Sequence, residues 1–254
     1  MQEQPQELVA ISPSMADLVR AIARTAHTPA TTLITGEPGT GKSLVAAVIH
    51  AASGRTGPFL IVDGSQSGRM LDVELFGRES FAADPELGLF ERASGGTLFI
   101  DHVEALPRTT QARLLSALQE RVIEHVGGTT PIAVDARVIA ATSANLAEAV
   151  REGRFRENLF YRLCVISLTV PPLRERREDI PALVTRFLAT AHGIPEAQVE
   201  PLTPEILSPL VNHRWPGNVR ELEARVRLLV AVRRGGPILP RHVARVLLET
   251  LPDD

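Results

Sequence analysis

The residues best suited to phosphate chemistry form one short glycine-rich segment. Its eight residues are Gly36, Glu37, Pro38, Gly39, Thr40, Gly41, Lys42 and Ser43. Lys42 is the single lysine of a chain with 27 basic residues, so the chain keeps this residue type where a compact ammonium is needed. In loops of this pattern the backbone N–H groups surround a phosphate, the lysine reaches its oxygens and the serine hydroxyl binds Mg²⁺. The spacing therefore predicts a phosphate-binding loop.

The segments on both sides of this loop have the patterns needed to position it. Residues 31–35 are β-branched and apolar and predict a short buried strand, while Leu44 begins an apolar run to His50 that predicts a helix. A helix that starts at the loop adds the positive end of its dipole to an anion site. We therefore count Leu44 with the loop as part of the binding segment.

A second apolar run ends in a carboxylate. Residues 95–100 lead into Asp101, an arrangement typical of Walker B strands, whose aspartate holds Mg²⁺ near the phosphates. We predict Ser43 and Asp101 as the metal ligands. Gly127 and Gly128 predict a hairpin turn before the next sheet strand, and that strand ends at Thr142 and Ser143, where a polar side chain would sense the γ-phosphate.

The order of these patterns predicts a mainly parallel α/β sheet followed by a helical segment. Strand-like runs recur with helical patterns between them, at residues 33–35, 59–62, 97–100, 137–141 and 165–170. A charged segment led by Pro171 follows, and helical periodicity continues from Pro181. We expect an αβ nucleotide-binding subdomain over residues 1–173 and a helical lid over residues 174–254.

The composition is that of a globular protein without a targeting or membrane segment. The chain has 254 residues, 44% hydrophobic and 22% charged, and a net charge of −3 with mixed signs, which argues against direct DNA binding. No apolar run approaches the length of a membrane span, so we expect a cytoplasmic protein. The lone Cys164 is expected to be a buried small hydrophobe.

Several stretches together resemble the central AAA+ ATPase domain of bacterial enhancer-binding proteins, which activate sigma-54 RNA polymerase. They lie at residues 74–77, 88–91, 95–101, 134–142, 155–163, 171–180 and 215–222. The resemblance implies a three-layer αβα P-loop fold with a helical lid, and ATP with Mg²⁺ as cofactors.

The resemblance also implies a site shared between subunits. Arg156 and Arg162 would be arginine fingers that reach a neighbouring subunit's γ-phosphate, which implies a homo-oligomer, most simply a hexameric ring. Arg220 would be the sensor arginine of the lid, whereas Trp215 and Pro216 would begin its helix. Leu8 and Val9 would contact adenine, although Ala10 stands where the family usually has Gly.

Three departures from the family affect the expected function. The interval from Arg78 to Leu87 is about four residues short and lacks the Gly-Ala-Phe-Thr-Gly-Ala motif that touches the sigma factor. Phe81 is then either a remnant of the motif's apex or, as we favour, a packing contact. His102 stands where the family has the Glu that polarises water, and Asp63 stands where it has Asn. We expect His102 and Asp63 to form a hydrogen-bonded pair, either a base dyad or a locked switch. Glu104 is a candidate substitute base if the strand continues, whereas a looped segment would turn it away.

Three functions remain open at this point. The first is an ATP-binding regulatory domain of a transcription regulator, with weak or absent hydrolysis and no sigma-54 remodelling. Its partners would be RNA polymerase or another regulator, with DNA reached through a separate domain or partner. The second is an active ATPase that remodels another protein. The third is an inactive interaction module that regulates an intact relative.

Overall fold

The structure is a computed structural model that describes residues 7–80, 85–233 and 236–248. Within this part of the chain, contacts divide the molecule into two compact units. The sheet unit contains Leu8 and residues 20–36 and 42–169, and the helical unit contains residues 9–19 and 37–41 and the chain from Val170 onward. Helix α1 (Pro13–Thr25) begins in the helical unit and ends in the sheet unit. The phosphate-binding loop is likewise divided, because its residues 37–41 belong to the helical unit.

A five-stranded parallel sheet forms the centre of the sheet unit. Its strand order is β2-β3-β6-β1-β7. The bounds are β1 (Thr32–Thr35), β2 (Phe59–Asp63), β3 (Thr97–Asp101), β6 (Arg137–Thr142) and β7 (Ile166–Thr169). Each of the five strand-like runs in the sequence is thus confirmed as a strand of this sheet.

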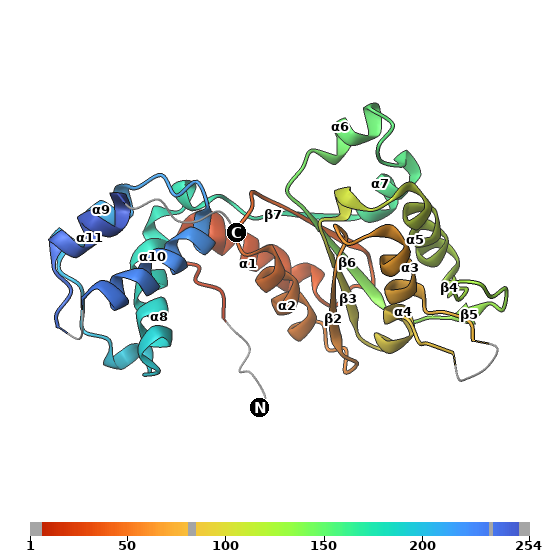
Figure 1. The fold of residues 1–254 in the computed structure, drawn as a ribbon, viewed down its shortest axis with the longest axis horizontal. Coiled ribbons are helices and arrows are strands. Elements are labelled where there is room, and N and C mark those ends of the chain that lie inside the picture. Colours follow the sequence, from red (N-terminus) through yellow and green to blue (C-terminus); the bar gives the residue numbers. More distant parts are fainter. Residues whose placement is uncertain (1–6, 81–84, 234–235, 249–254) are drawn as a thin grey trace. The chain divides into compact units, whose positions relative to one another are not determined.

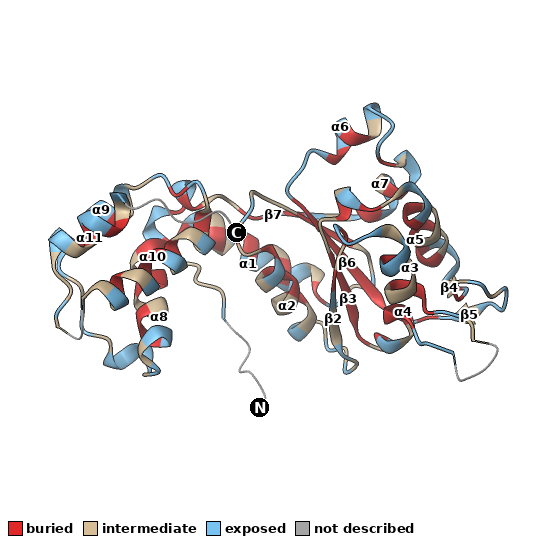
Figure 2. Cartoon of the chain, viewed as in Figure 1, coloured by how far each residue is buried: buried red, intermediate tan, exposed pale blue. Residues whose placement is uncertain are grey.

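Helices cover both faces of the sheet, as the period of two in its strands requires. Leu33, Leu98 and Val138 belong to the core shared with the α3, α5 and α7 side, whereas Ile34, Phe99 and Ile139 alternate with them and are equally buried. Helix α2 (Lys42–Ala51) lies on the opposite side of the sheet from α3 and α5 (Figure 1). Figure 2 marks the strands of the main sheet as largely buried, and these helices as part buried and part exposed. The helices beyond α2 are α3 (Gly68–Phe76), α4 (Leu89–Arg92), α5 (Arg108–Glu120), α6 (Leu146–Arg151) and α7 (Glu157–Leu163). The predicted three-layer αβα fold is confirmed.

The hairpin expected around Gly127 exists, but its strands are not part of the main sheet. Strands β4 (Val122–Ile123) and β5 (Ile132–Ala133) form their own antiparallel pair. Gly127 has φ +86, and the N–H of Gly128 donates to His125 O in a turn. The next strand of the main sheet is β6, so the prediction was wrong about which strand follows the turn.

The helical unit contains α8 (Ile180–His192), α9 (Pro204–Asn212), α10 (Asn218–Val232) and α11 (Pro240–Leu248). Short 3₁₀ segments are η1 (Val103–Ala105) in the sheet unit, and η2 (Leu173–Glu175), η3 (Arg177–Asp179) and η4 (Glu196–Gln198) in the helical unit. Trp215 is fully buried and its indole N–H donates to Leu210 O at 2.8 Å, so its packing role is confirmed. Helix α10 begins at Asn218, and Pro216 therefore precedes the helix that it was expected to start.

Candidate nucleotide site

The carboxyl ends of four neighbouring strands bring the predicted site residues of the sheet unit together. The register pairs Asp63 with Asp101 across β2 and β3, and Thr35 with Thr142 across β1 and β6. The phosphate-binding loop follows Thr35 directly. Parallel α/β sheets bind ligands at this edge, because the helices and loops that leave the strands diverge there.

Lys42 is held at this edge by groups from two strand ends. Its ammonium donates to Gly36 O at 3.0 Å and to Ser143 Oγ at 2.6 Å, and the residue is 7% exposed. The Thr142 hydroxyl is buried instead, and its contacts are with the backbone of Ala144. Ser143, rather than Thr142, is therefore the polar side chain that reaches Lys42. Both residues end one strand, and the turn after β6 decides which side chain faces the loop.

His102 and Asp63 form the pair expected from the sequence. His102 Nδ1 lies 3.1 Å from Asp63 Oδ1. Burial acts to raise the pKa of Asp63, but the Ser65 N–H and the His102 ring outweigh it, so this pKa lies below its ordinary value. An ionised carboxylate only accepts, and Nδ1 must therefore carry the proton. His102 also has φ +48, a left-handed conformation that the sequence pattern did not indicate.

Glu104 follows on the 3₁₀ segment η1, so the strand does not continue beyond Asp101. Its Oε1 accepts from the backbone N–H of Ser143 at 3.4 Å. Its Oε2 is buried and has no hydrogen-bond partner among the described residues. The carboxylate thus lies beside the residue whose hydroxyl contacts Lys42. A buried carboxylate oxygen without a partner is unusual and suggests a role in binding water or a ligand.

The predicted metal ligands are oxygen donors of the kind that Mg²⁺ prefers. Ser43 is exposed on the first turn of α2, and Asp101 Oδ1 accepts from the backbone N–H of His102 at 3.0 Å. Within the described residues, no group of three or more His, Cys, Asp or Glu could hold a metal. Mg²⁺ is usually held by one or two protein oxygens together with substrate phosphates, which fits this pair. Leu44 follows Ser43 and is half-buried.

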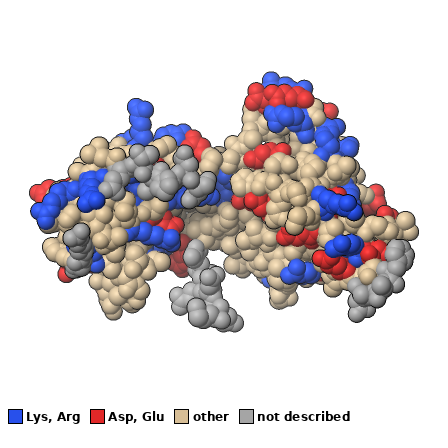
Figure 3. Space-filling view, viewed as in Figure 1, with Lys and Arg blue, Asp and Glu red and all other residues tan. Residues whose placement is uncertain are grey.

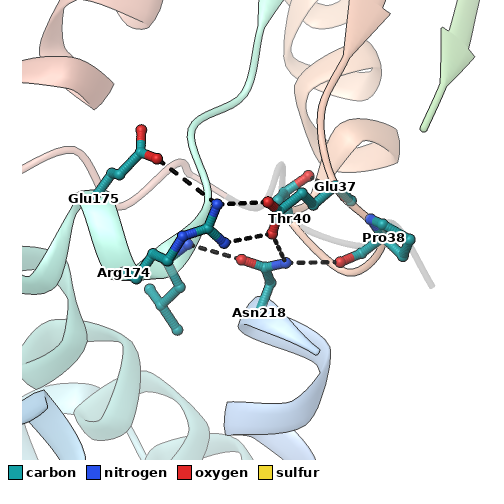
Figure 4. A network of polar contacts seen from close by, with 7 residues as sticks. Glu37, Pro38, Thr40, Arg174, Glu175 and Asn218 are labelled. Carbon is teal, nitrogen blue, oxygen red and sulfur yellow. Dashed lines mark hydrogen bonds and ion pairs between the residues drawn. The ribbon is translucent and has the colours of Figure 1, made fainter. Parts of the chain in front are cut away.

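The middle of the phosphate-binding loop packs within the helical unit. Arg174 binds the Glu37 carboxylate through two hydrogen bonds of 2.7 and 2.6 Å, and Asn218 donates to Glu37 Oε2 at 3.1 Å and to Pro38 O at 3.0 Å (Figure 4). The hydrogen bonds from Arg174, aided by Asn218, lower the pKa of Glu37 to about 2. Sequence reasoning missed Arg174 and Asn218. They lie 137 and 181 residues from Glu37, and no spacing rule connects them.

The other predicted binding residues lie apart from the strand ends. Arg220 is exposed, and its backbone N–H donates to Gly39 O at 3.2 Å within the helical unit. Val9 packs against the core of the helical unit, and Leu8 is half-buried in the sheet unit. Leu8 and Val9, the two residues expected to contact adenine, thus belong to different units.

The two predicted arginine fingers both contact helix α5. Arg156 Nε donates to Arg108 O at 3.2 Å, and Arg162 donates to Leu118 O at 3.2 and 2.7 Å. Arg162 is exposed and Arg156 is partly exposed. The acceptors are backbone carbonyls, which carry no net charge and so do not neutralise the guanidinium groups.

A cavity of about 230 Å³ lies in the sheet unit, away from the phosphate-binding loop. Its lining includes Thr31, Ala136 and Val165, which immediately precede β1, β6 and β7. The cavity is therefore at the amino ends of the strands, where such sheets do not bind nucleotides. On the face in Figure 3, basic and acidic side chains are interspersed. Among the described helices, none is long and apolar enough to span a membrane.

The segment expected to replace the sigma-contact loop is only partly described. Phe81, the possible remnant of the motif, lies outside the described residues. The two arms of the segment pair through Arg78 and Glu86, and the N–H of Glu79 donates to Val126 O at 3.1 Å. The base of the segment is therefore fixed to the β4–β5 hairpin.

Comparisons with known proteins agree with this architecture. A family described as "Sigma-54 interaction domain" matches residues 8–169, and an "AAA+ ATPase lid domain" matches residues 174–254. The fold is thus of the AAA+ P-loop class. The chain belongs to the sigma-54 interaction domain family.

Individual relatives cover nearly the whole chain. The DNA-binding transcriptional regulator NtrC of Azospirillum brasilense is 46% identical over 89% of this chain and 48% of its own length. NtrX from Brucella abortus in complex with ADP is 38% identical, with a TM-score of 0.86 over 98% of this chain and 57% of that one. NtrX in complex with ATP is 39% identical, with a TM-score of 0.83 over 96% of this chain and 59% of that one. The chain spans about half the length of the curated relatives it matches.

Proposed function

We propose that this chain is the ATP- and Mg²⁺-binding regulatory domain of a transcription regulator, in which nucleotide drives assembly and hydrolysis is weak or absent. The observation that carries this proposal is Lys42, whose ammonium lies between Gly36 O and Ser143 Oγ at the ligand-binding edge of the sheet. The solved NtrX complexes with ADP and ATP support nucleotide as the ligand.

The residues present fit ATP and Mg²⁺. The ammonium of Lys42 and the N-terminus of α2 supply positive charge for the phosphates. Ser43 and Asp101 supply oxygen donors for Mg²⁺, which would neutralise charge on the phosphates when bound. Arg220 would report on the nucleotide from the helical lid, whereas Leu8 and Val9 would contact adenine. Residues 1–173 and 174–254 would be the functional subdomains, with residues 9–19, 37–41 and 170–173 of the first packed in the helical unit.

The His102–Asp63 pair supports weak hydrolysis. A general base must present a lone pair to the attacking water. The ionised Asp63 carboxylate accepts from Nδ1 and fixes the orientation of the ring, and an imidazole lacks the negative charge and the reach of the carboxylate that the family has at this position. We therefore propose a locked switch at this position instead of a base dyad.

Assembly into a ring would complete the site. Arg156 and Arg162 hydrogen-bond to backbone carbonyls of α5 and keep their full charge, which suits them to a phosphate on a neighbouring subunit. We propose a homo-oligomer, most simply a hexamer. Its partners would be RNA polymerase or another regulator, without sigma-54 remodelling, and with DNA reached through a separate domain or partner.

Nucleotide binding and turnover, measured over a protein concentration series, test this function. We expect Mg·ATP to bind, to increase the molar mass seen by light scattering, and to be hydrolysed slowly. Lys42→Ala should remove binding and assembly together. Fast turnover that rises with concentration would refute the locked switch, and ATP binding without any change in mass would refute nucleotide-driven assembly.

A second candidate function is an active ATPase that remodels another protein, and Glu104 favours it. Its unpartnered Oε2 is buried beside Ser143, which contacts Lys42, so this carboxylate is close to the expected phosphate site. A carboxylate there would act as the general base in place of the Glu that the family has at position 102.

Single-turnover hydrolysis by Glu104→Gln separates the two candidates. The substitution preserves shape and removes the basic oxygen. A loss of about 100-fold or more with unchanged ATP affinity would favour the active ATPase. An unchanged slow rate would favour the regulatory domain. Glu152→Gln, on an exposed residue paired with Arg154, is the matched control.

A further inference from the structure

The phosphate-binding loop contains an acidic side chain, which works against its proposed ligand. Glu37 follows Gly36 directly and precedes the backbone N–H groups that would face the phosphates. A carboxylate at this place repels a triphosphate through the Coulomb interaction, unless a positive charge compensates it. The compensation in this chain comes from the helical unit.

Arg174 meets this carboxylate in the geometry that best neutralises it. Two guanidinium nitrogens donate to the two carboxylate oxygens, at 2.7 and 2.6 Å. Such a fork is more specific than a point charge, and lysine cannot reproduce it. Both side chains are about two-fifths exposed. The pair is therefore open to solvent, and its importance for a ligand depends on charge balance more than on burial.

Further contacts in the same unit hold the backbone of the loop. Asn218 is fully buried, accepts from Leu173 N at 2.8 Å and donates to Pro38 O. Arg176 donates to Thr40 O at 2.7 Å, and Val219 N donates to Gly39 O at 2.9 Å. The carbonyl groups of three consecutive residues, Pro38, Gly39 and Thr40, thus accept hydrogen bonds from residues 176–219 of the helical unit. In a trans peptide unit the N–H points opposite to the C=O, so the N–H groups of Gly39 and Gly41 are directed away from the groups that bind the carbonyls of Pro38 and Thr40.

We propose that Arg174 and Asn218 are positioning residues for the nucleotide: they cancel the charge of Glu37 and hold residues 37–41 in the shape that receives phosphate. This inference rests on the proposed function, since it says which contacts give the loop its affinity for ATP. It implies that Glu37, alone in a phosphate-binding loop of otherwise uncharged residues before Lys42, is tolerated because the lid neutralises it. Lid and phosphate loop are then coupled through this ion pair and through the hydrogen bonds to the loop carbonyls.

The electrostatic part of the proposal predicts that a second substitution rescues the first. Arg174→Met keeps an apolar stem and leaves the Glu37 charge uncompensated, so affinity for Mg·ATP should fall about tenfold. Glu37→Gln removes the charge and should leave affinity within about twofold of the wild type. The double substitution should recover most of the lost affinity, because no unpaired charge remains. A purely structural role of Arg174 would not give this recovery.

A titration of the full 254-residue chain with a fluorescent ATP analogue and Mg²⁺ tests the inference. Arg227→Ala is the matched control, since Arg227 forms an exposed pair with Glu223 in the same unit. Thermal unfolding without nucleotide shows whether each variant is folded. If Arg174→Met does not fold, Arg174→Gln and Arg174→Lys decide: a loss of affinity at least about threefold larger in Arg174→Gln than in Arg174→Lys, which keeps the positive charge, supports the proposal, and equal losses overturn it.

The outcomes separate this inference from the proposed function. Wild-type affinity in Arg174→Met, or a double variant as weak as Arg174→Met, would overturn the inference while nucleotide binding stands. A wild-type chain that binds no ATP, or a Lys42→Ala chain that binds it equally well, would overturn both.

Discussion

The loop between β1 and α2 and the end of β3 both follow the carboxyl ends of strands of one sheet. The loop has every residue type that its expected function needs, whereas the end of β3 does not. The loop has the glycines, Lys42 and Ser43 that phosphate binding needs. The end of β3 has Asp101 for a metal, but His102 beside it is paired with Asp63. Because the two functions are carried by different strands, a chain can keep nucleotide binding while its hydrolysis changes.

The largest expected effect tests the binding half of this comparison. Lys42→Ala should weaken Mg·ATP binding by about 100-fold or more, because it removes a charge-assisted contact to the phosphates. Titration with a fluorescent ATP analogue measures it, with Arg227→Ala as the control. A loss below about fivefold would mean that this loop is not the phosphate site.

The next effect tests the hydrolytic half. His102→Glu together with Asp63→Asn should raise ATP turnover about 30-fold, since it supplies a carboxylate base and removes the group that locks position 102. His102→Glu by itself should gain less, because two adjacent carboxylates would disfavour each other's ionised forms. Steady-state phosphate release measures the rates. Adding Lys42→Ala to the double variant should abolish the gain, and turnover that stays at the wild-type rate would show that this pair does not limit hydrolysis.

A smaller effect concerns the packing of the loop in the helical unit. Gly39 has φ +74, and a Cβ there would lie 2.3 Å from Gly217 O. Gly39→Ala should therefore lower the free energy of unfolding by about 3 kcal/mol and weaken ATP binding.

Gly193→Ala is the matched control for this substitution. Gly193 has φ +65 in the same unit, but a Cβ there would meet nothing within 4 Å. We expect a loss of about 1 kcal/mol and unchanged ATP affinity. Equal losses of stability in a denaturant titration would show that the contact with Gly217 contributes nothing.

The smallest expected effect is that of pH on the contribution of Glu37 to ATP affinity, which we expect to stay unchanged over a wide range. The pKa of Glu37 falls from its ordinary 4.5 to about 2 in the folded protein. A depressed carboxyl pKa contributes stability that is fully present above the ordinary value and is lost as pH falls from there toward the folded one. The ratio of ATP affinities of the wild type and Glu37→Gln should thus stay constant from about pH 8 to about pH 4, where a carboxyl of ordinary pKa would be largely protonated. A drift of this ratio within that range would mean that the carboxylate titrates there and is not held by Arg174.

Local pattern was sufficient for the elements of the sheet unit. Each predicted strand is a short apolar run with β-branched residues, and its preference does not depend on distant partners. The same locality explains one error. The turn at Gly127 was visible in the sequence, but the strand that follows it, Ile132–Ala133, is too short to be distinguished by pattern.

The pair of His102 and Asp63 was predictable because the resemblance places these residues where the family has its Glu and Asn, and β2 and β3 are neighbours whose ends meet in the structure. The contact between Ser143 and Lys42 was harder to predict, because Thr142 and Ser143 are adjacent polar residues and the turn after β6 determines which of them faces Lys42. Glu104 was a candidate base from the sequence, but the position of its carboxylate beside Ser143 required the structure, because η1 redirects the chain immediately after the strand.

The sequence by itself determined the AAA+ fold class and the chemistry of the phosphate-binding loop, because both depend on residue types at short, fixed spacings. Tertiary structure alone decided what holds that loop. Arg174 and Asn218 contact Glu37 across 137 and 181 residues of chain, because residues 37–41 pack in the helical unit. Charge compensation over such a separation leaves no periodic signal in a sequence, since any arginine could supply it.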